Sequence, residues 1–156
     1  MDNLLPDKRG KTVAEYLPSG GNCTEYRKDD ILLGNIRPYL KKIWIANHRG
    51  GSNGDVLIIR LTTETVLPRY LYYVLGSDKF FSYNMQFSKG SKMPRGSKQA
   101  IMKYPISVPS VSEQKHIIRI LDKFSKLIND MREGLPAEIA LRQKQYEYYR
   151  DKLLSF

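Results

Sequence analysis

The sequence has very little cysteine and no long apolar segment. Cys23 is the only cysteine among the 156 residues, which excludes an intramolecular disulfide and a zinc site built on several thiolates. No apolar run approaches the roughly 18 residues that span a membrane. The first residues also lack the apolar core of a signal peptide. We therefore expect a cytoplasmic protein without membrane association.

Signatures of catalysis are also scarce. The two histidines, His48 and His116, lack a plausible set of partners, and neither HExxH nor GxSxG occurs. The segment FSKGSKMPRGSKQA (residues 87–100) is not a phosphate-binding P-loop, because five residues separate its two glycines instead of four and serine precedes lysine. NIRPY (residues 35–39) only approaches the N-P-P-Y motif of amino-methyltransferases, and no glycine-rich loop for S-adenosylmethionine accompanies it. We predict no catalytic residue, no metal site and no cofactor bound by this chain.

Positive charge is what the sequence has in excess. Lys and Arg number 26 against 16 Asp and Glu, which gives a formal net charge of +10. Most of this excess lies in residues 1–110, whereas basic and acidic residues nearly balance in residues 111–156. Such an excess favours a polyanionic partner, with nucleic acid ahead of an anionic membrane. The alternative is a protein whose basic surface is merely solvated.

The pattern of the first 109 residues predicts an α/β (α+β) domain with a twisted sheet and short helices. Apolar, β-branched runs predict strands at residues 31–33, 43–46, 55–61 and 102–108. A proline in the first turn and a glycine stop predict a helix at residues 68–76, and a second short helix follows at about residues 78–86.

Residues 110–156 predict a long helical region. Ser110 and Glu113 form a capping-box pattern at its start. Apolar residues then recur at helical spacing and form one stripe, with an interruption at Gly134 and Pro136: Ile117, Leu121, Phe124, Leu127, Ile128, Met131, Ile139, Tyr146, Tyr149 and Leu153. One continuous helix, kinked near the interruption, would be about 65 Å long at ~1.5 Å per residue and would need a partner in an antiparallel coiled coil. The alternative is two shorter helices that fold back at Gly134.

Two basic clusters in the first part are candidates for binding nucleic acid. In one, a lysine or arginine recurs at every third residue of a glycine- and serine-containing loop; in the other, basic residues flank Tyr39 and lie near Trp44. Basic side chains, serine hydroxyls and free amides can all contact phosphates. The predicted DNA-binding residues are Arg37, Tyr39, Lys41, Lys42, Lys89, Ser91, Lys92, Arg95 and Lys98. Arg95 is the best candidate for reading a base, because its planar fork can form two hydrogen bonds. The alternative is that Trp44 and the residues around Tyr39 mainly support the core.

The order of several segments resembles a known family. DDILLGNIRPYLKKIWIA, DVLIIRL, LPRYLYYVLGS, GSKMPRGSK, YPISVPSVSEQKHIIRILDKF and EIALRQKQYEYYRDKLLSF follow one another as in the specificity subunits of type I restriction-modification systems. The resemblance implies a target recognition domain at residues 1–109 and a helical dimerisation and spacer region at residues 110–156. In that family two such domains, joined by an antiparallel coiled coil, each read half of a split DNA site. The specificity subunit catalyses nothing; modification subunits carry S-adenosylmethionine and methylate adenine, and restriction subunits can join them.

Compared with that family, this chain resembles a half subunit whose front edge is truncated. Its single helical region lacks the second helix on which it would pack in the family. We therefore expect a homodimer held together by the apolar stripe, and this homodimer would read a symmetric split site. Two other functions stay open at this point. One is a nucleic-acid-binding protein without sequence choice, and the other is a coiled-coil fragment that binds modification subunits without competent DNA reading.

Overall fold

A small antiparallel sheet forms the centre of the first part of the chain. The computed structural model describes residues 3–14, 23–131 and 136–155. In the three-stranded sheet, β2 (Ile31–Gly34) lies between β3 (Ile43–Ile45) and β5 (Val56–Ile59), and both neighbours are antiparallel to it. A separate two-stranded sheet pairs β1 (Thr24–Tyr26) with β4 (Gly50–Ser52). Strands predicted at residues 31–33, 43–46 and 55–61 are therefore confirmed, and their antiparallel pairing makes the domain α+β.

Four short helical elements surround this sheet. They are η1 (Pro38–Leu40), α1 (Pro68–Leu75), α2 (Asp78–Gln86) and α3 (Lys98–Met102). Helix α1 starts at a proline and is capped by Gly76, and Ser77 caps α2 by accepting a hydrogen bond from the amide of Phe80. Both predicted helices are thus confirmed.

The predicted strand at residues 102–108 is wrong. Residues 98–102 form α3 instead, whose first turn is capped by the Ser97 hydroxyl, which accepts a hydrogen bond from the Ala100 amide at 3.3 Å. No strand follows within residues 103–110. Pro105 and Pro109 lack the amide hydrogens that a sheet ladder requires. The alternation of Ile106 and Val108 with polar residues was therefore insufficient evidence for a strand.

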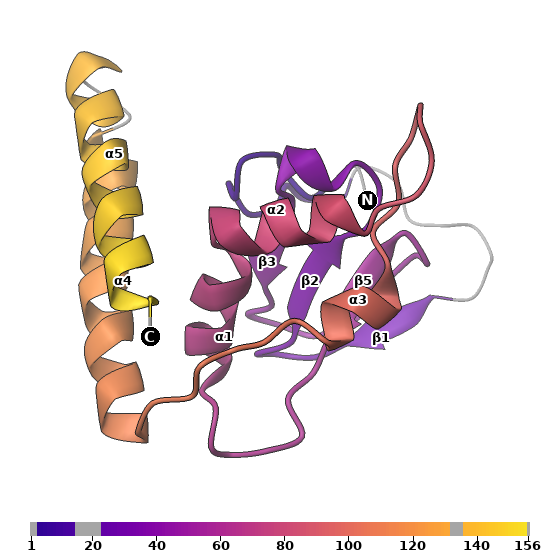
Figure 1. Cartoon of the computed structure of the whole chain (residues 1–156), viewed down its shortest axis with the longest axis horizontal. Helices are drawn as coiled ribbons and strands as arrows, with labels where there is room; N and C mark the ends of the chain where they lie inside the picture. Colours follow the sequence, from indigo (N-terminus) through magenta and orange to yellow (C-terminus); the bar gives the residue numbers. More distant parts are fainter. Residues whose placement is uncertain (1–2, 15–22, 132–135, 156) are drawn as a thin grey trace.

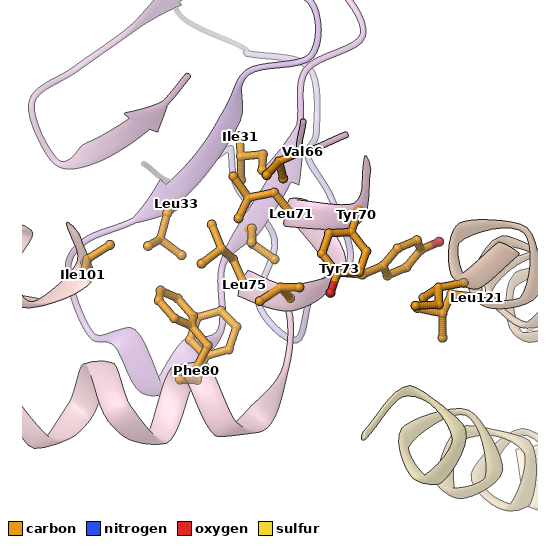
Figure 2. Close-up of a cluster of buried hydrophobic side chains, with 14 residues drawn as sticks. Ile31, Leu33, Val66, Tyr70, Leu71, Tyr73, Leu75, Phe80, Ile101 and Leu121 are labelled. Carbon is orange, nitrogen blue, oxygen red and sulfur yellow. The ribbon is translucent and has the colours of Figure 1, made fainter. Parts of the chain in front are cut away.

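The main core lies between the sheet and the helices. Figure 2 shows this cluster extending from Ile31 and Leu33 on the sheet, through Tyr73 on α1, to Leu121 on α4 (Val111–Met131). Leu32, whose side chain leaves the opposite face of β2, packs instead in a smaller cluster that includes Leu4. Strand β2 is buried on both faces for this reason.

The helical region consists of two helices that lie side by side in opposite directions (Figure 1), α4 and α5 (Pro136–Leu153). The rings of Phe124 and Tyr149 stack between them with centroids 5.5 Å apart. Of the two alternatives from sequence, the described residues thus support two helices that fold back and not one continuous helix. Gly134 lies outside the described residues.

This fold-back changes the role of the predicted apolar stripe. Because α4 crosses α1, Ile117 and Leu121 are buried in the chain's own core, and Tyr146 and Leu153 of α5 pack against the same cluster. A second copy of the chain is not needed to cover these residues. Leu127 and Tyr149 remain exposed, and Ile128 is half-buried. The side chains of two other members lie outside the described part of the structure: Met131 and Ile139.

Polar contacts fix the helical region to the domain. The capping box is present: Ser110 donates its amide and hydroxyl to Glu113 Oε2 at 2.9 and 2.6 Å. Gln114, fully buried, accepts a hydrogen bond from the Leu67 amide at 2.8 Å and donates to the carbonyl oxygens of Thr65 and Pro109. These bonds hold the start of α4 against the start of α1.

Candidate nucleic-acid interface

The basic loop between α2 and α3 is a tight hairpin on a fixed stem. Lys89 and Arg95 exchange both backbone hydrogen bonds, at 3.0 and 2.8 Å. Gly90 turns the chain in the left-handed region with φ 101°, where a side chain would be strained. The loop projects from the end of the domain that lies away from α4 and α5 (Figure 1). The loop thus combines a fixed base with an exposed tip that includes Ser91 and Lys92.

The stem also joins the two predicted basic clusters. The Arg37 amide donates to the carbonyl of Pro94 at 2.7 Å, and the Gly96 amide donates to the carbonyl of Asn35 at 3.0 Å. Arg37, whose φ is 52°, is exposed beside the hairpin, and Tyr39 is exposed two residues further on. Residues 35–39 and the loop therefore form one continuous surface, which we call the basic surface.

Gly96 allows the stem to approach Asn84, which is fully buried, and Asn35, which is half-buried. A Cβ atom at this position would lie 2.6 Å from Asn84 Oδ1 and 2.8 Å from Asn35 Oδ1, distances that side-chain atoms do not adopt. Within the described residues neither of these oxygens has a hydrogen-bond partner, although Asn84 is fully buried. The sequence analysis missed both asparagines, because nothing in their local pattern signals burial.

Three lysines of the basic surface are free to meet an anion. Lys89, Lys92 and Lys98 are exposed, and none of their ammonium groups forms an ion pair with a carboxylate in the described parts of the chain. Arg95 differs, because its Nη1 lies 3.2 Å from Asp55 Oδ1. Lys89 and Lys92 lie on the hairpin and Lys98 is the first residue of α3, so three positive charges and one held guanidinium are gathered at the hairpin and the helix start that follows it.

The second predicted cluster is only partly available. Lys41 Nζ donates to Asp78 Oδ1 at 2.7 Å and so holds η1 against the start of α2. Lys42 is half-buried, and its carbonyl accepts a hydrogen bond from the Gly34 amide at 2.9 Å. Lys41 therefore has a structural role in this fold, whereas Arg37 keeps an exposed side chain.

Asp78 is the centre of an ion cluster that the sequence analysis missed. Besides Lys41 it contacts Lys8 at 3.3 Å and Arg150 of α5 at 3.5 Å. Burial alone would raise the pKa of Asp78, but the hydrogen bond from Lys41 and the charges of Lys8 and Arg150 outweigh burial and lower this pKa to about 2. Burial and the nearby Arg150 charge lower the pKa of Lys8. An acidic residue in the first turn of a helix was the only local signal.

Trp44 is half-buried and packs within the fold. Its ring meets Tyr26 edge-on at 5.7 Å, and the Lys11 ammonium lies 5.1 Å from its centroid. It packs against the smaller core cluster. Trp44 therefore contributes to core packing, as one alternative from the sequence expected, whereas Tyr39 is exposed.

The described residues form neither a metal site nor a membrane-spanning helix. Among them, no group of three or more His, Cys, Asp or Glu side chains could hold a metal ion. No helix in residues 3–14, 23–131 and 136–155 is both long and apolar enough to cross a membrane.

Comparison with known proteins identifies the family of this α+β domain and its basic hairpin. A family model described as "Type I restriction modification DNA specificity domain" matches residues 11–141, and the chain belongs to this family. The resemblance seen in the sequence is therefore confirmed. Specificity subunits are not the catalytic subunits of type I systems, so the prediction of a non-enzymatic chain is also confirmed.

Three curated relatives bear specificity-subunit names. The chain is 43% identical over 93 residues to the type I restriction enzyme EcoR124I/EcoR124II specificity subunit of Escherichia coli, which covers 60% of this chain and 23% of the relative. A putative specificity subunit of Haemophilus influenzae is 41% identical over 91 residues, covering 58% and 22%. The C-terminal part of a putative Mycoplasma pneumoniae specificity subunit is 38% identical over 100 residues, covering 64% and 65%. The chain thus spans about a quarter of the first two relatives.

Solved structures show the same fold. The HsdS subunit from Thermoanaerobacter tengcongensis superposes with a TM-score of 0.63 at 22% identity, over 83% of this chain and 35% of that one. A structure described as concerning complex assembly and conformational transition of the type I R-M system gives a TM-score of 0.65 at the same identity, over 83% and 36%.

Proposed function

We propose that this chain is a DNA-reading module that directs adenine methylation, and restriction, by partner subunits of a type I restriction-modification system. The observation that carries the proposal is the basic hairpin, a fixed stem that presents exposed lysines without ion-pair partners. The description of the matching family model, which names DNA specificity, supports DNA as the ligand that this surface would bind.

At the hairpin and the start of α3, two kinds of contact are expected. Lys89, Lys92 and Lys98 would neutralise backbone phosphates, which adds affinity without sequence information. Arg95 would contact a base edge, because its guanidinium can donate two parallel hydrogen bonds to guanine. Arg37 and Tyr39, exposed beside the stem, would extend the same contact surface.

Catalysis would belong to other subunits. We assign S-adenosylmethionine to a partner modification subunit, with a restriction subunit as a further possible member of the assembly. Because DNA and these partners are in the cell interior, the chain would act in the cytoplasm.

We also propose that two copies of the chain associate through the helical region. Helices α4 and α5 carry large apolar side chains that stay exposed among the described residues: Leu127, Leu141, Tyr148 and Tyr149, with exposed fractions of 41%, 68%, 60% and 37%. A two-fold dimer could bury the same patch on both copies. Two recognition domains would then face two halves of a symmetric split site.

The test is selection of bound duplexes from a randomised DNA library by the purified chain at about 150 mM salt, where non-specific contacts are weakened. The proposal predicts enrichment of one recurring sequence. Retention of all sequences alike, with a steep salt dependence, would instead indicate a general nucleic-acid-binding protein. Absence of DNA binding together with capture of a modification subunit would indicate a fragment that binds partners only.

A further inference from the structure

Arg95 combines a fixed backbone with an exposed side chain. Its amide and carbonyl both bond Lys89, and the flanking residues Pro94 and Gly96 bond Arg37 and Asn35 respectively. Backbone hydrogen bonds to the segments on either side of Arg95 therefore fix the position of its Cα. The side chain itself is 59% exposed. Orientation of the guanidinium thus depends on what the side chain contacts.

Asp55 supplies that contact from a separate segment of the chain. Its Oδ1 lies 3.2 Å from Arg95 Nη1, and its side chain is 34% exposed. The carbonyl of Asp55 accepts a hydrogen bond from the Asn35 amide at 2.9 Å, immediately before β5 begins. Asn35 thus bonds Asp55 through its amide and Gly96, the neighbour of Arg95, through its carbonyl, so one residue connects the two segments that carry the ion pair.

The geometry leaves the guanidinium able to bind further. A guanidinium has five N–H donors in a rigid fork, and a single contact at Nη1 occupies only one edge of it. The remaining donors can still form the two parallel bonds that guanine O6 and N7 accept. A half-exposed pair of this kind adds little to folding stability, so fixing the direction of the fork is its main physical consequence.

We propose that Asp55 is a specificity-positioning residue, which holds the Arg95 guanidinium in the direction that presents its free donors to a guanine edge in the major groove. This inference rests on the proposed function, in which Arg95 reads a base. The inference adds that recognition of the guanine depends on the Asp55 carboxylate, although this carboxylate does not contact the base.

The experiment compares Asp55→Asn with Glu64→Gln in the whole chain. Glu64→Gln removes the same charge from an exposed position in the loop before α1. The probes are the duplex selected by the wild-type chain and duplexes in which each guanine in turn is replaced. Affinity for each probe is measured at several salt concentrations, and circular dichroism checks that the variants fold.

At one guanine, Asp55→Asn should lower the discrimination between the selected and replaced duplexes by about 5- to 10-fold, part of what a bidentate contact provides. The slope of log affinity against log salt should stay unchanged, and Glu64→Gln should change neither quantity. Arg95→Lys, which keeps the charge but loses the fork, should lose the same discrimination. Asp55→Asn added to Arg95→Lys should have no further effect.

Two results would overturn the inference. Equal strengthening of all probes by Asp55→Asn would show that the carboxylate acts only as a charge. Preserved preference in Arg95→Lys would show that the base is read elsewhere, while the proposed function stands. Failure of the proposed function looks different, because the wild-type chain would then prefer no duplex at all.

Discussion

Replacing Lys89, Lys92 and Lys98 together by alanine should weaken DNA binding and reduce its dependence on salt. These three ammonium groups are exposed, and none is paired with a carboxylate among the residues that the structure describes. Each one that neutralises a phosphate contributes about 0.9 to the slope of log affinity against log salt. Three such contacts amount to a slope change of about 2.7.

The size of the effect follows directly. Between about 50 and about 200 mM salt, the affinity of the triple variant should fall about 40-fold less than that of the wild-type chain. Fluorescence anisotropy with a labelled duplex measures both slopes. The selected sequence should not change, because phosphate contacts carry no sequence information.

The matched control removes three exposed lysines from α4: Lys115, Lys123 and Lys126. It produces the same change in net charge on the region that lies away from the hairpin (Figure 1). Its salt slope should remain within about one unit of the wild-type value. Equal slopes for both triple variants would refute the reasoning, because the loss would then reflect net charge and not a contact surface.

Three further predictions concern stability and assembly. Leu121→Ala should lower the free energy of unfolding by about 2–5 kcal/mol, because Leu121 is fully buried, whereas Met102→Ala, at an exposed side chain, should cost under ~1 kcal/mol in denaturant titrations. The hydrogen bond from Arg60 lowers the pKa of Asp30, so the contribution of this ion pair to folding stability should be complete above the ordinary carboxyl pKa of 3.8 and decline as the pH falls below that value. Asp30→Asn should therefore flatten the dependence of the free energy of unfolding on pH over that range. A variant whose pH profile matches that of the wild-type chain would contradict this prediction. Light scattering should show a dimer at micromolar concentration that becomes monomeric when Leu141 and Tyr148 are both replaced by glutamate; a wild-type monomer would refute the proposed dimer.

Elements with strong local signals could be predicted from the sequence. Helix α1 begins at Pro68 and ends before Gly76, and the apolar run at Val56–Ile59 follows a glycine-rich turn. The failed strand at residues 102–108 lacked such agreement, because Pro105 and Pro109 contradict a ladder. The fold-back of α5 depends on contacts with α1 and α4, so periodicity alone could not choose it over a continuous helix.

The candidate site shows the same division. The spacing of the basic residues indicated the basic loop, since this spacing is visible within ten residues, Lys89 to Lys98. The ion cluster was not visible, because Asp78 meets Lys41 from 37 positions away and Arg150 from 72. The exposed fork of Arg95 was expected, but its partner Asp55 lies 40 positions earlier in the chain. Such pairs are determined by tertiary packing, which brings together residues that are distant in the sequence.

The most direct test of the central claim is a map of methylated adenines in DNA from cells that express a type I modification subunit with or without this chain. The account predicts methylation within one recurring sequence only when the chain is present. It also predicts that the Lys89, Lys92 and Lys98 triple variant lowers the methylated fraction without changing that sequence. A methylation pattern that is the same with and without the chain would contradict the account.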